Sequence, residues 1–521
     1  MNETIVKHLN FGEDARNKVF EGIEKLTKAV SSTLGASGKC VILEDSQGNP
    51  QITKDGVTVA DTVILLDPVE NMGSKLLKEA ARKTVREAGD GTTTATVLAH
   101  AILLEAYKVI KSESRRDIKT GINEAVDKVI KYLDKIAKPV TGDRIEQVAT
   151  ISSNNDKELG HIIAQAFKAV DETGIVTMEI NDSPETIVDK IEGVQYEKGF
   201  TSPHFVTNSG NNTAELDNPL VLIIENKIES IRKLQSTLEY IMSNESGKPS
   251  LLLIADVDLQ VMQALAMNKL KGNFKLNLIE PPIYGVNRKD ILDDLCLLTG
   301  ATLINEDLGD DMDLIQPEHF GRCTKTISTP TETLIQVEKI PEEIDEVIKE
   351  IKEKINSTTN PNFKIRYEKR LARLLAKMAI VKVGANSEVE LKEKRDRVED
   401  AICATKAAIK EGIVPGGGIA LLNAAQSIKP TSTSEAILLD AIKSPYLTIL
   451  KNAGIEKYET PVIKGRGLDV VTGKTVSMVK SGIIDPLLVT KSALRNAASV
   501  ATTILSTDCV INNLRTHESN R

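Results

Sequence analysis

A run of small and polar residues at positions 89–94, GDGTTT, has the composition of a loop that holds phosphate and magnesium. Glycine lets backbone N–H groups approach a ligand closely, and the first turn of a following helix leaves N–H donors unpaired at its positive end. Threonine hydroxyls add donors, and Asp90 supplies the hard oxygen that Mg²⁺ prefers. The alternative is a plain glycine turn with a threonine N-cap, which we favour for a lone GDG but not for GDGTTTAT.

Three further segments have groups that suit the same ligand. Residues 33–39 (TLGASGK) form a glycine-bearing turn, although a glycine after a helix is usually only a C-cap. Residues 53–56 (TKDG) combine a cation, a carboxylate and a tight turn, as many surface turns also do. Residues 416–418 (GGG) precede a helical pattern. Because three consecutive glycines lose much conformational entropy on folding, we expect them to serve a close approach of the backbone to a ligand. None of these segments is a Walker A or kinase loop.

The composition excludes several classes of protein. The 521 residues are 41% apolar and 27% charged, which indicates a globular chain of two to four domains. Only 3% are aromatic, which favours helix-rich and α/β cores. A net charge of −8 disfavours a nucleic-acid partner, and the five cysteines and six histidines show no disulfide or metal spacing. Without a signal peptide or a membrane-spanning stretch, we expect a cytoplasmic protein with no membrane partner.

Apolar spacing predicts a helical first part, an α/β middle and a helical last part. Helical periodicity dominates residues 14–135 and returns after about residue 385. The middle alternates buried-strand runs with helical stretches, as βαβ units do: strands at 220–224, 251–255 and 276–279, helices at 228–243 and 258–271. Two charged amphipathic helices then form an expected hairpin, the second carrying Leu371 and Met378. Since the candidate loops lie near both ends, a shared site requires the middle to be an insertion.

The stretch 258–271 carries two apolar stripes where a surface helix needs only one. One stripe contains Leu259, Met262, Leu265 and Ala266, and the other contains Val261, Ala264 and Met267. The helix is therefore either buried on both sides or deliberately exposed on one, and the sequence gives the two equal weight. An exposed face rich in methionine would suit many different partners.

The motifs stand in the order found in one protein family. They are TKDGV (53–57), ENMG (70–73), GDGTTTAT (89–96), RVEDA (397–401), the GxxxGGG run at 412–418 and IDP (484–486). From about residue 10 to residue 511 the chain closely resembles group I chaperonins of the GroEL type. The resemblance implies a mixed α/β and mainly α fold of three domains: a helical equatorial ATPase domain (1–136 and 412–521), a small intermediate domain (137–192 and 378–411) and an α/β apical domain (193–377).

The resemblance also implies an activity and its partners. Members of the family hydrolyse ATP with Mg²⁺ and K⁺, form rings of seven subunits that are single or double, and bind non-native polypeptides beneath a small co-chaperonin lid. The implied catalytic carboxylates are Asp400, which positions the attacking water, and Asp55. Alone, Asp400 would be interpreted as part of a solvated helix face, so its role rests on the resemblance.

The remaining site residues follow from the same match. The nucleotide-binding set is Thr33, Leu34, Gly35, Ala36, Lys54, Asp90, Gly91, Thr92, Thr93, Thr94, Gly416, Gly417, Asp469 and Asp485. Asp90 would bind Mg²⁺, and Thr33, Lys54 and Thr93 would frame K⁺. The set that binds polypeptide or the lid is Phe200, His204, Phe205, Gln235, Leu238, Met262, Ala266 and Met267.

Several positions depart from the family pattern. Ala36 replaces a usual proline, and Asp469 with Val470 and Val471 replaces Asn-Ala-Ala beside the base. Gln235 and His204 replace leucine and tyrosine, which makes the apical face more polar. These departures indicate a divergent member, such as a paralogue or a virus-encoded version. Two other functions stay open, a metabolic ATP-dependent transferase and a degenerate scaffold that does not cycle ATP, although Asp55, Asp90 and Asp400 argue against the scaffold.

Overall fold

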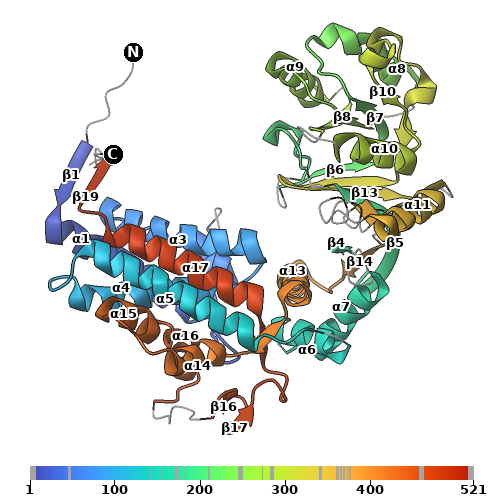
Figure 1. The fold of residues 1–521 in the computed structure, drawn as a ribbon. Helices are drawn as coiled ribbons and strands as arrows, with labels where there is room; N and C mark the ends of the chain where they lie inside the picture. Colours follow the sequence, from blue (N-terminus) through green and yellow to red (C-terminus); the bar gives the residue numbers. More distant parts are fainter. Residues whose placement is uncertain are drawn as a thin grey trace. The chain divides into compact units, whose positions relative to one another are not determined.

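The computed structural model describes residues 7–513, apart from 45–47, 141, 154, 171–174, 182, 197, 209–211, 245–249, 273, 282–286, 339–342, 457–462 and scattered positions between 359 and 376. Its chain divides into two compact units (Figure 1). The first comprises Met1–Ala164, Ile180–Thr186 and Val383–Arg521, and the second comprises Gln165–Glu179 and Ile187–Lys382. The α/β middle is thus inserted between two parts of a helical unit. The finer division into three domains stays a prediction.

The core of the first unit is built from long helices of both ends of the chain. These are α1 (Gly12–Ser31), α3 (Pro68–Ala88), α4 (Thr92–Val109), α5 (Arg115–Ile136) and α17 (Leu487–Leu505), joined by α14 (Ile419–Ser427), α15 (Thr433–Ala441) and α16 (Ser444–Asn452). The helical periodicity predicted from residue 14 onward is confirmed in α1, where Val19, Ile23, Leu26 and Val30 are all buried on one face. Small aliphatic side chains fill this core almost alone, as the scarcity of aromatic residues predicted.

Short antiparallel strand pairs tie distant segments of this unit together. β1 (Lys7–Phe11) pairs with β19 (Cys509–Asn513), and β15 (Ile413–Pro415) pairs with β18 (Ile484–Pro486). Two further pairs are local hairpins, β2 (Val41–Glu44) with β3 (Pro50–Thr53) and β16 (Arg466–Asp469) with β17 (Lys474–Ser477). The pairing of β15 with β18 brings the GGG segment beside Asp485.

One long helix, α13 (Glu388–Glu411), crosses the first unit and carries Asp400. It begins at Ser387, whose hydroxyl accepts a hydrogen bond from the Glu390 N–H and so caps the helix. It packs against α6 (Asp143–Ser152), α17 and the end of α3. The helix therefore reaches the segment that follows α3, which is the GDG loop.

The second unit contains a parallel sheet with helices on both faces. Its strands run in the order β10 (Leu303–Ile304), β7 (Leu220–Ile224), β8 (Ser250–Ile254) and β9 (Lys275–Ile279), and β11 (Gly321–Arg322) pairs antiparallel with β7. Alternate residues of each strand face opposite sides. Leu222 packs with α8 (Gln235–Asn244) and α9 (Leu259–Leu270), whereas Val221 packs with α10 (Asn287–Thr299) and α11 (Glu343–Ser357). The predicted βαβ alternation is confirmed.

A six-stranded sheet completes the second unit. Its order is β4 (Ile175–Ile180), β14 (Lys377–Val383), β5 (Ile187–Tyr196), β13 (Thr333–Val337), β12 (Lys325–Ser328) and β6 (Ala214–Asp217). The helix α7 (Lys157–Val170) precedes β4. The prediction that Met378 belongs to a helix with Leu371 is wrong, because Met378 lies in β14 and is buried beside Leu334. An apolar residue at helical spacing can equally be the first inward residue of a strand.

No helix among the described residues is long and apolar enough to cross a membrane.

Candidate functional site

Two left-handed glycines shape the GDG loop of the first unit. Gly89 ends α3 with φ +74°, and Gly91 precedes α4 with φ +96°, a conformation that residues with a Cβ rarely adopt. A Cβ on Gly91 would also lie 2.8 Å from Val489. No side chain caps the first turn of α4, so its N–H groups at the positive end of the helix dipole are available to an anion.

The helix α13 lies directly against this loop. A Cβ on Gly89 would stand 2.4 Å from the Cβ of Cys403, so only glycine permits the contact. Asp400 precedes Cys403 by three residues and shares its helix face. Loss of hydration, followed by the charges of Asp90 and then Asp55, raises the pKa of Asp400 well above its ordinary value. The structure thus brings together three carboxylates that are distant in the sequence.

Asp55 is held in place by the helix that it starts. Its carboxylate accepts hydrogen bonds from the Val57 N–H (3.1 Å) and the Thr58 N–H (2.7 Å), and so caps α2 (Gly56–Thr62). A Cβ on Gly56 would lie 2.2 Å from the Thr93 hydroxyl oxygen, which places the TKDG turn against the threonine run. Lys54 is half-buried in this turn. The TKDG turn therefore lies beside the threonine run, and Asp55 is close enough for its charge to act on Asp90.

Asp485 lies on β18 and faces the glycines at 416–418. It accepts hydrogen bonds from the backbone N–H groups of Gly417 and Gly418, both of which are left-handed. Burial, and then the charge of Asp90, raises the pKa of Asp485 to about 7. Burial and the charge of Asp55 likewise raise the pKa of Asp90, although its hydrogen bond with the Gly91 N–H opposes this shift. The site therefore concentrates several negative charges in a small buried volume.

This donor set fits a magnesium ion that is shared with a phosphate ligand. Mg²⁺ is usually held by one or two carboxylates together with substrate oxygens and water. The described residues contain no group of three His, Cys, Asp or Glu that could hold a metal by themselves. Asp90 alone supplies a carboxylate inside the loop, and its raised pKa reflects a charge that a cation would stabilise.

Asn452 stabilises the turn that follows α1, and no sequence pattern pointed to this residue. The side-chain amide of Asn452, at the end of α16, donates to the carbonyls of Ser31 (2.8 Å) and Leu34 (2.9 Å). A Cβ on Gly35, whose φ is +87°, would lie 3.1 Å from Ile449. Ala36 is exposed in this turn, and the Thr33 hydroxyl donates to the Val30 carbonyl at 2.9 Å.

Asp469 lies at the tip of the β16–β17 hairpin. Its carboxylate accepts from the Val471 N–H (3.0 Å) and the Thr472 hydroxyl (2.7 Å), so it shapes the hairpin turn. The hairpin packs on α14 and α16 through Met478, which also lies 3.2 Å from a Cβ built on Gly417. Asp469 and residues 33–36 therefore flank α16, while the carboxylates gather around Asp90.

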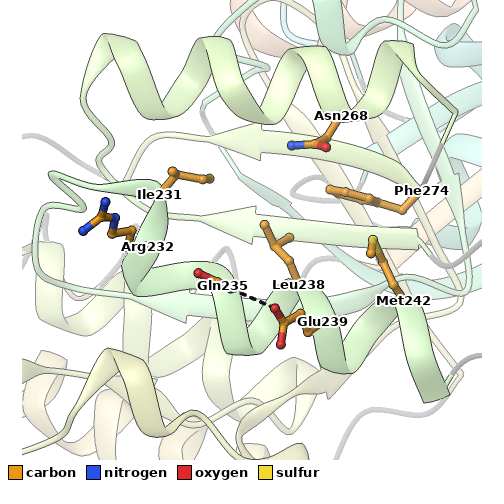
Figure 2. A pocket seen from close by; sticks show the side chains of 8 residues that line it. All are labelled: Ile231, Arg232, Gln235, Leu238, Glu239, Met242, Asn268 and Phe274. Atoms are coloured by element: carbon orange, nitrogen blue, oxygen red, sulfur yellow. Dashed lines mark hydrogen bonds between the residues drawn. The ribbon is translucent and has the colours of Figure 1, made fainter.

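The second unit has a groove between α8 and α9, and Figure 2 shows its lining. Its volume is about 190 Å³, and it is lined by Ile231, Arg232, Gln235, Leu238, Glu239, Met242, Asn268 and Phe274. Ile231 and Arg232 belong to a short 3-10 turn, Ile231–Leu234, that leads into α8. The Gln235 amide donates to the Glu239 carboxylate at 2.9 Å. The groove thus combines an apolar floor with a polar rim.

The predicted polypeptide-binding residues divide between surface and core. Gln235 and Leu238 line the groove, Met262 and Phe200 are half-buried, and His204 is exposed. Met267 is 54% exposed, whereas Phe205 and Ala266 are buried in the core below the groove. The two stripes of α9 therefore divide unevenly: Val261 and Leu265 face the core, and Leu259 and Met267 face outward.

Sequence patterns missed other residues of both sites. Cys403 and Asn452 act through contacts between segments distant in the sequence, for which no spacing exists. Met242 follows Leu238 by four residues, and this helical spacing could have revealed it. Phe274 directly precedes β9, and only the folded structure places it opposite α8.

Comparison with known proteins agrees with this geometry. Residues 26–515 match the TCP-1/cpn60 chaperonin family. The chain belongs to this family. The predicted chaperonin membership is therefore confirmed, and the family supports a chaperone role.

Solved structures of a phage chaperonin have the same fold. The chaperonin gp146 from the bacteriophage EL 2 (Pseudomonas aeruginosa), crystallised in the presence of ATP-BeFx, matches in crystal form II with a TM-score of 0.75 and 21% identity, over 99% of this chain and all of that chain. Crystal form I of the same protein matches with a TM-score of 0.66 and 21% identity, over 97% of this chain and 99% of that one. The predicted fold class of this chaperonin is confirmed.

Proposed function

We propose that this chaperonin is an ATP-dependent chaperone that hydrolyses ATP with Mg²⁺ and uses the cycle to bind and release non-native polypeptides. The observation that carries the proposal is the meeting of Asp400 on α13 with Asp90 and Asp55 beside an uncapped helix start. Phosphoryl transfer to water requires positioning and neutralisation of charge more than covalent chemistry, and this set of residues provides both.

Each loop has a distinct task in this proposal. The open N–H groups of α4 and the hydroxyls of Thr92, Thr93 and Thr94 hold the phosphates. Asp90 ligates Mg²⁺, which neutralises phosphate charge when it is bound. The nucleoside part lies against Gly417 and Asp485 and against the wall formed by residues 33–36 and Asp469. Thr33, Lys54 and Thr93 frame K⁺.

Asp400 accepts a proton from the attacking water in this proposal, so it must be ionised. Its raised pKa in the nucleotide-free site favours the protonated form, whereas a bound cation nearby favours the carboxylate. Binding of the metal-nucleotide complex therefore prepares the base for hydrolysis. A carboxylate on α13 also makes hydrolysis depend on the position of that helix.

The groove between α8 and α9 is the proposed polypeptide site. Covering apolar surface stabilises a complex by about 25 cal/mol per Å², so one small groove binds weakly. Several copies in a ring raise the avidity without requiring a specific sequence. We infer a homo-oligomeric ring, of seven subunits by analogy with the family, and a small co-chaperonin lid on the same apical surface.

A substitution in α13 tests the catalytic assignment. We expect Asp400→Asn to slow ATP hydrolysis by about 10²-fold or more, because the base is lost. Nucleotide affinity should change by only a few-fold, since Asp400 does not hold the phosphates. Hydrolysis is measured with radiolabelled ATP and affinity with a fluorescent nucleotide. Glu388→Gln, an exposed change on the same helix, is the control. Unchanged turnover in Asp400→Asn would exclude this mechanism.

Imaging and refolding test the chaperone function as a whole. Negative-stain images with and without ATP should show an oligomer that changes shape, and the same preparation should raise the refolding yield of a denatured test protein. Asp400→Asn should assemble normally but release little refolded protein. A monomer that neither changes shape nor rescues the test protein would overturn the proposal. A stable oligomer without ATP turnover would instead indicate a scaffold.

A further inference from the structure

The groove between α8 and α9 has two chemically different ends. Figure 2 shows Arg232 and Ile231 at one end and Met242 and Phe274 at the other, with Leu238 between them. The guanidinium lies at the turn that precedes α8, and the two large apolar side chains lie ten or more residues further along the chain. A chain segment in the groove would therefore meet charge at one end and apolar surface at the other.

Arg232 differs from the basic residues beside it. Lys227 pairs with Asp258, and Lys233 pairs with Glu306 at 2.8 Å. Among the described residues, the guanidinium of Arg232 forms no ion pair, and its side chain is exposed in the groove. The groove's own carboxylate, Glu239, accepts instead from Gln235. One positive charge in the groove is thus left for a partner to neutralise.

We propose that the groove selects extended polypeptide segments in which an acidic side chain pairs with Arg232 while a large apolar side chain occupies the end formed by Leu238, Met242 and Phe274. This inference rests on the proposed function, because it assumes that the groove binds polypeptide. Gln235 supports the selection, because its amide donates to the carboxylate of Glu239, which is the one acidic side chain among the described residues that line the groove.

The length of the groove fixes the spacing within the segment. Leu238 and Met242 follow Arg232 by six and ten residues, which at about 1.5 Å per residue gives distances of roughly 9–15 Å. An extended chain advances about 3.3 Å per residue. The acidic residue and the apolar residue should therefore be about four positions apart in the bound segment.

Labelled peptides test this selection on the full-length, assembled protein. Two peptides of about twelve residues, built on Ser, Gly and Thr with a Leu-Phe pair, differ in carrying Glu or Lys four positions from that pair. Fluorescence anisotropy should show about three- to fivefold tighter binding of the Glu peptide, the range of an exposed ion pair. A third peptide with Glu beside the pair should lose this advantage, and high salt should abolish it.

Charge reversal in the protein assigns the effect to one side chain. Arg232→Glu should reverse the preference toward the Lys peptide, whereas Lys352→Glu, an exposed change on α11, should leave it unchanged. Equal binding of both peptides by the wild type, lost in Leu238→Ser, would overturn the selection but keep the groove as the polypeptide site. No binding of any peptide, with unaltered refolding activity in Leu238→Ser, would overturn the groove assignment itself.

Discussion

At the scale of single residues, the candidate site brings four carboxylates close together. Asp55, Asp90, Asp400 and Asp485 come from four segments, and the pKa values of Asp90, Asp400 and Asp485 are all raised. Such an arrangement is unfavourable for the empty protein and favourable for the complex with a cation. In our proposal, binding of the metal-nucleotide complex relieves this repulsion.

Asp485 makes this repulsion measurable as a dependence on pH. Its native pKa of about 7 lies above that of an unfolded carboxyl, about 3.9, so the native state binds more protons between these values. The free energy of unfolding due to this group is therefore highest below pH 4 and falls as pH rises to 7. Asp485→Asn removes this loss. As pH rises from 4 to 8, the free energy of unfolding of the variant should therefore increase relative to that of the wild type by roughly 2–4 kcal/mol.

Urea unfolding at a fixed protein concentration, without nucleotide, measures this difference at each pH. Asn can still accept the N–H bonds of Gly417 and Gly418, so a simple loss of hydrogen bonds is avoided. Asp469→Asn, the same substitution at the hairpin tip, is the matched control. A gap between Asp485→Asn and wild type that stays constant with pH would contradict the raised pKa.

At the scale of elements, the contact between α13 and the GDG loop decides whether Asp400 reaches the site. Gly89 is the residue that permits it, because a Cβ there would lie 2.4 Å from the Cys403 Cβ and clash with it. The contact is made by backbone and small side chains, so it has little room to adjust.

Gly89→Ala should therefore slow ATP hydrolysis by about ten- to a hundredfold, since a displacement of about 1 Å has this effect on catalysis. The double variant Gly89→Ala with Cys403→Gly removes the opposing Cβ and should recover part of the rate, despite the cost of glycine in a helix. Single-turnover kinetics on all three variants gives the comparison. If the double variant hydrolyses ATP as slowly as Gly89→Ala, the slow rate results from strain at the positive φ of residue 89 and not from the contact with α13.

Elements were predictable from the sequence where one physical rule dominated. The aliphatic runs that became β7, β8 and β9 are too short for buried helices and alternate with helical stretches, and the apolar spacing of α1 is typical of an amphipathic helix. Met378 was assigned to the wrong element because apolar spacing near the boundary of an element fits both the helical period and the strand period. Phe205 matched the family pattern for an exposed strip, yet it packs into the core because large rings are most stable there.

The site was predictable only in part for a different reason. The runs GDGTTT and GGG are recognisable because their composition is unusual for a loop, whereas TKDG resembles many surface turns and gained weight only from the family match. Asn452 and Arg232 have ordinary chemistry, and what matters is what they face in the folded chain: two backbone carbonyls in one case and an apolar groove in the other. Such roles follow from tertiary structure alone.

At the scale of the whole molecule, two strand pairs present apolar surface that a second copy could cover. Phe11 on β1 is 62% exposed and Ile511 on β19 is 53% exposed, while Ile42 and Ile52 on the β2–β3 hairpin are 71% and 65% exposed. Two-stranded ribbons of this kind have free edges and are seldom stable alone. They suit assembly of the ring that we propose.

Ile42→Asp and Ile52→Asp together should therefore shift the protein to smaller species in size-exclusion chromatography with light scattering, and refolding activity should be lost with the ring. Leu308→Asp introduces the same charge at a leucine that is 81% exposed in the second unit, and should leave the oligomer intact. An unchanged oligomer in the double variant would place the subunit interface elsewhere.

The helical unit cannot finish its core until the last part of the chain is made. α3, α4 and α5 bury their apolar faces against α17, and about 350 residues separate the end of α5 from the start of α17. At a synthesis rate of about 5–20 residues per second, the first helices wait roughly 20–70 seconds on the ribosome for their partner. The inserted α/β unit has its own core and completes it during that delay. Biosynthesis thus leaves the unit that we propose to bind ATP as the last part of this chaperonin to complete its core.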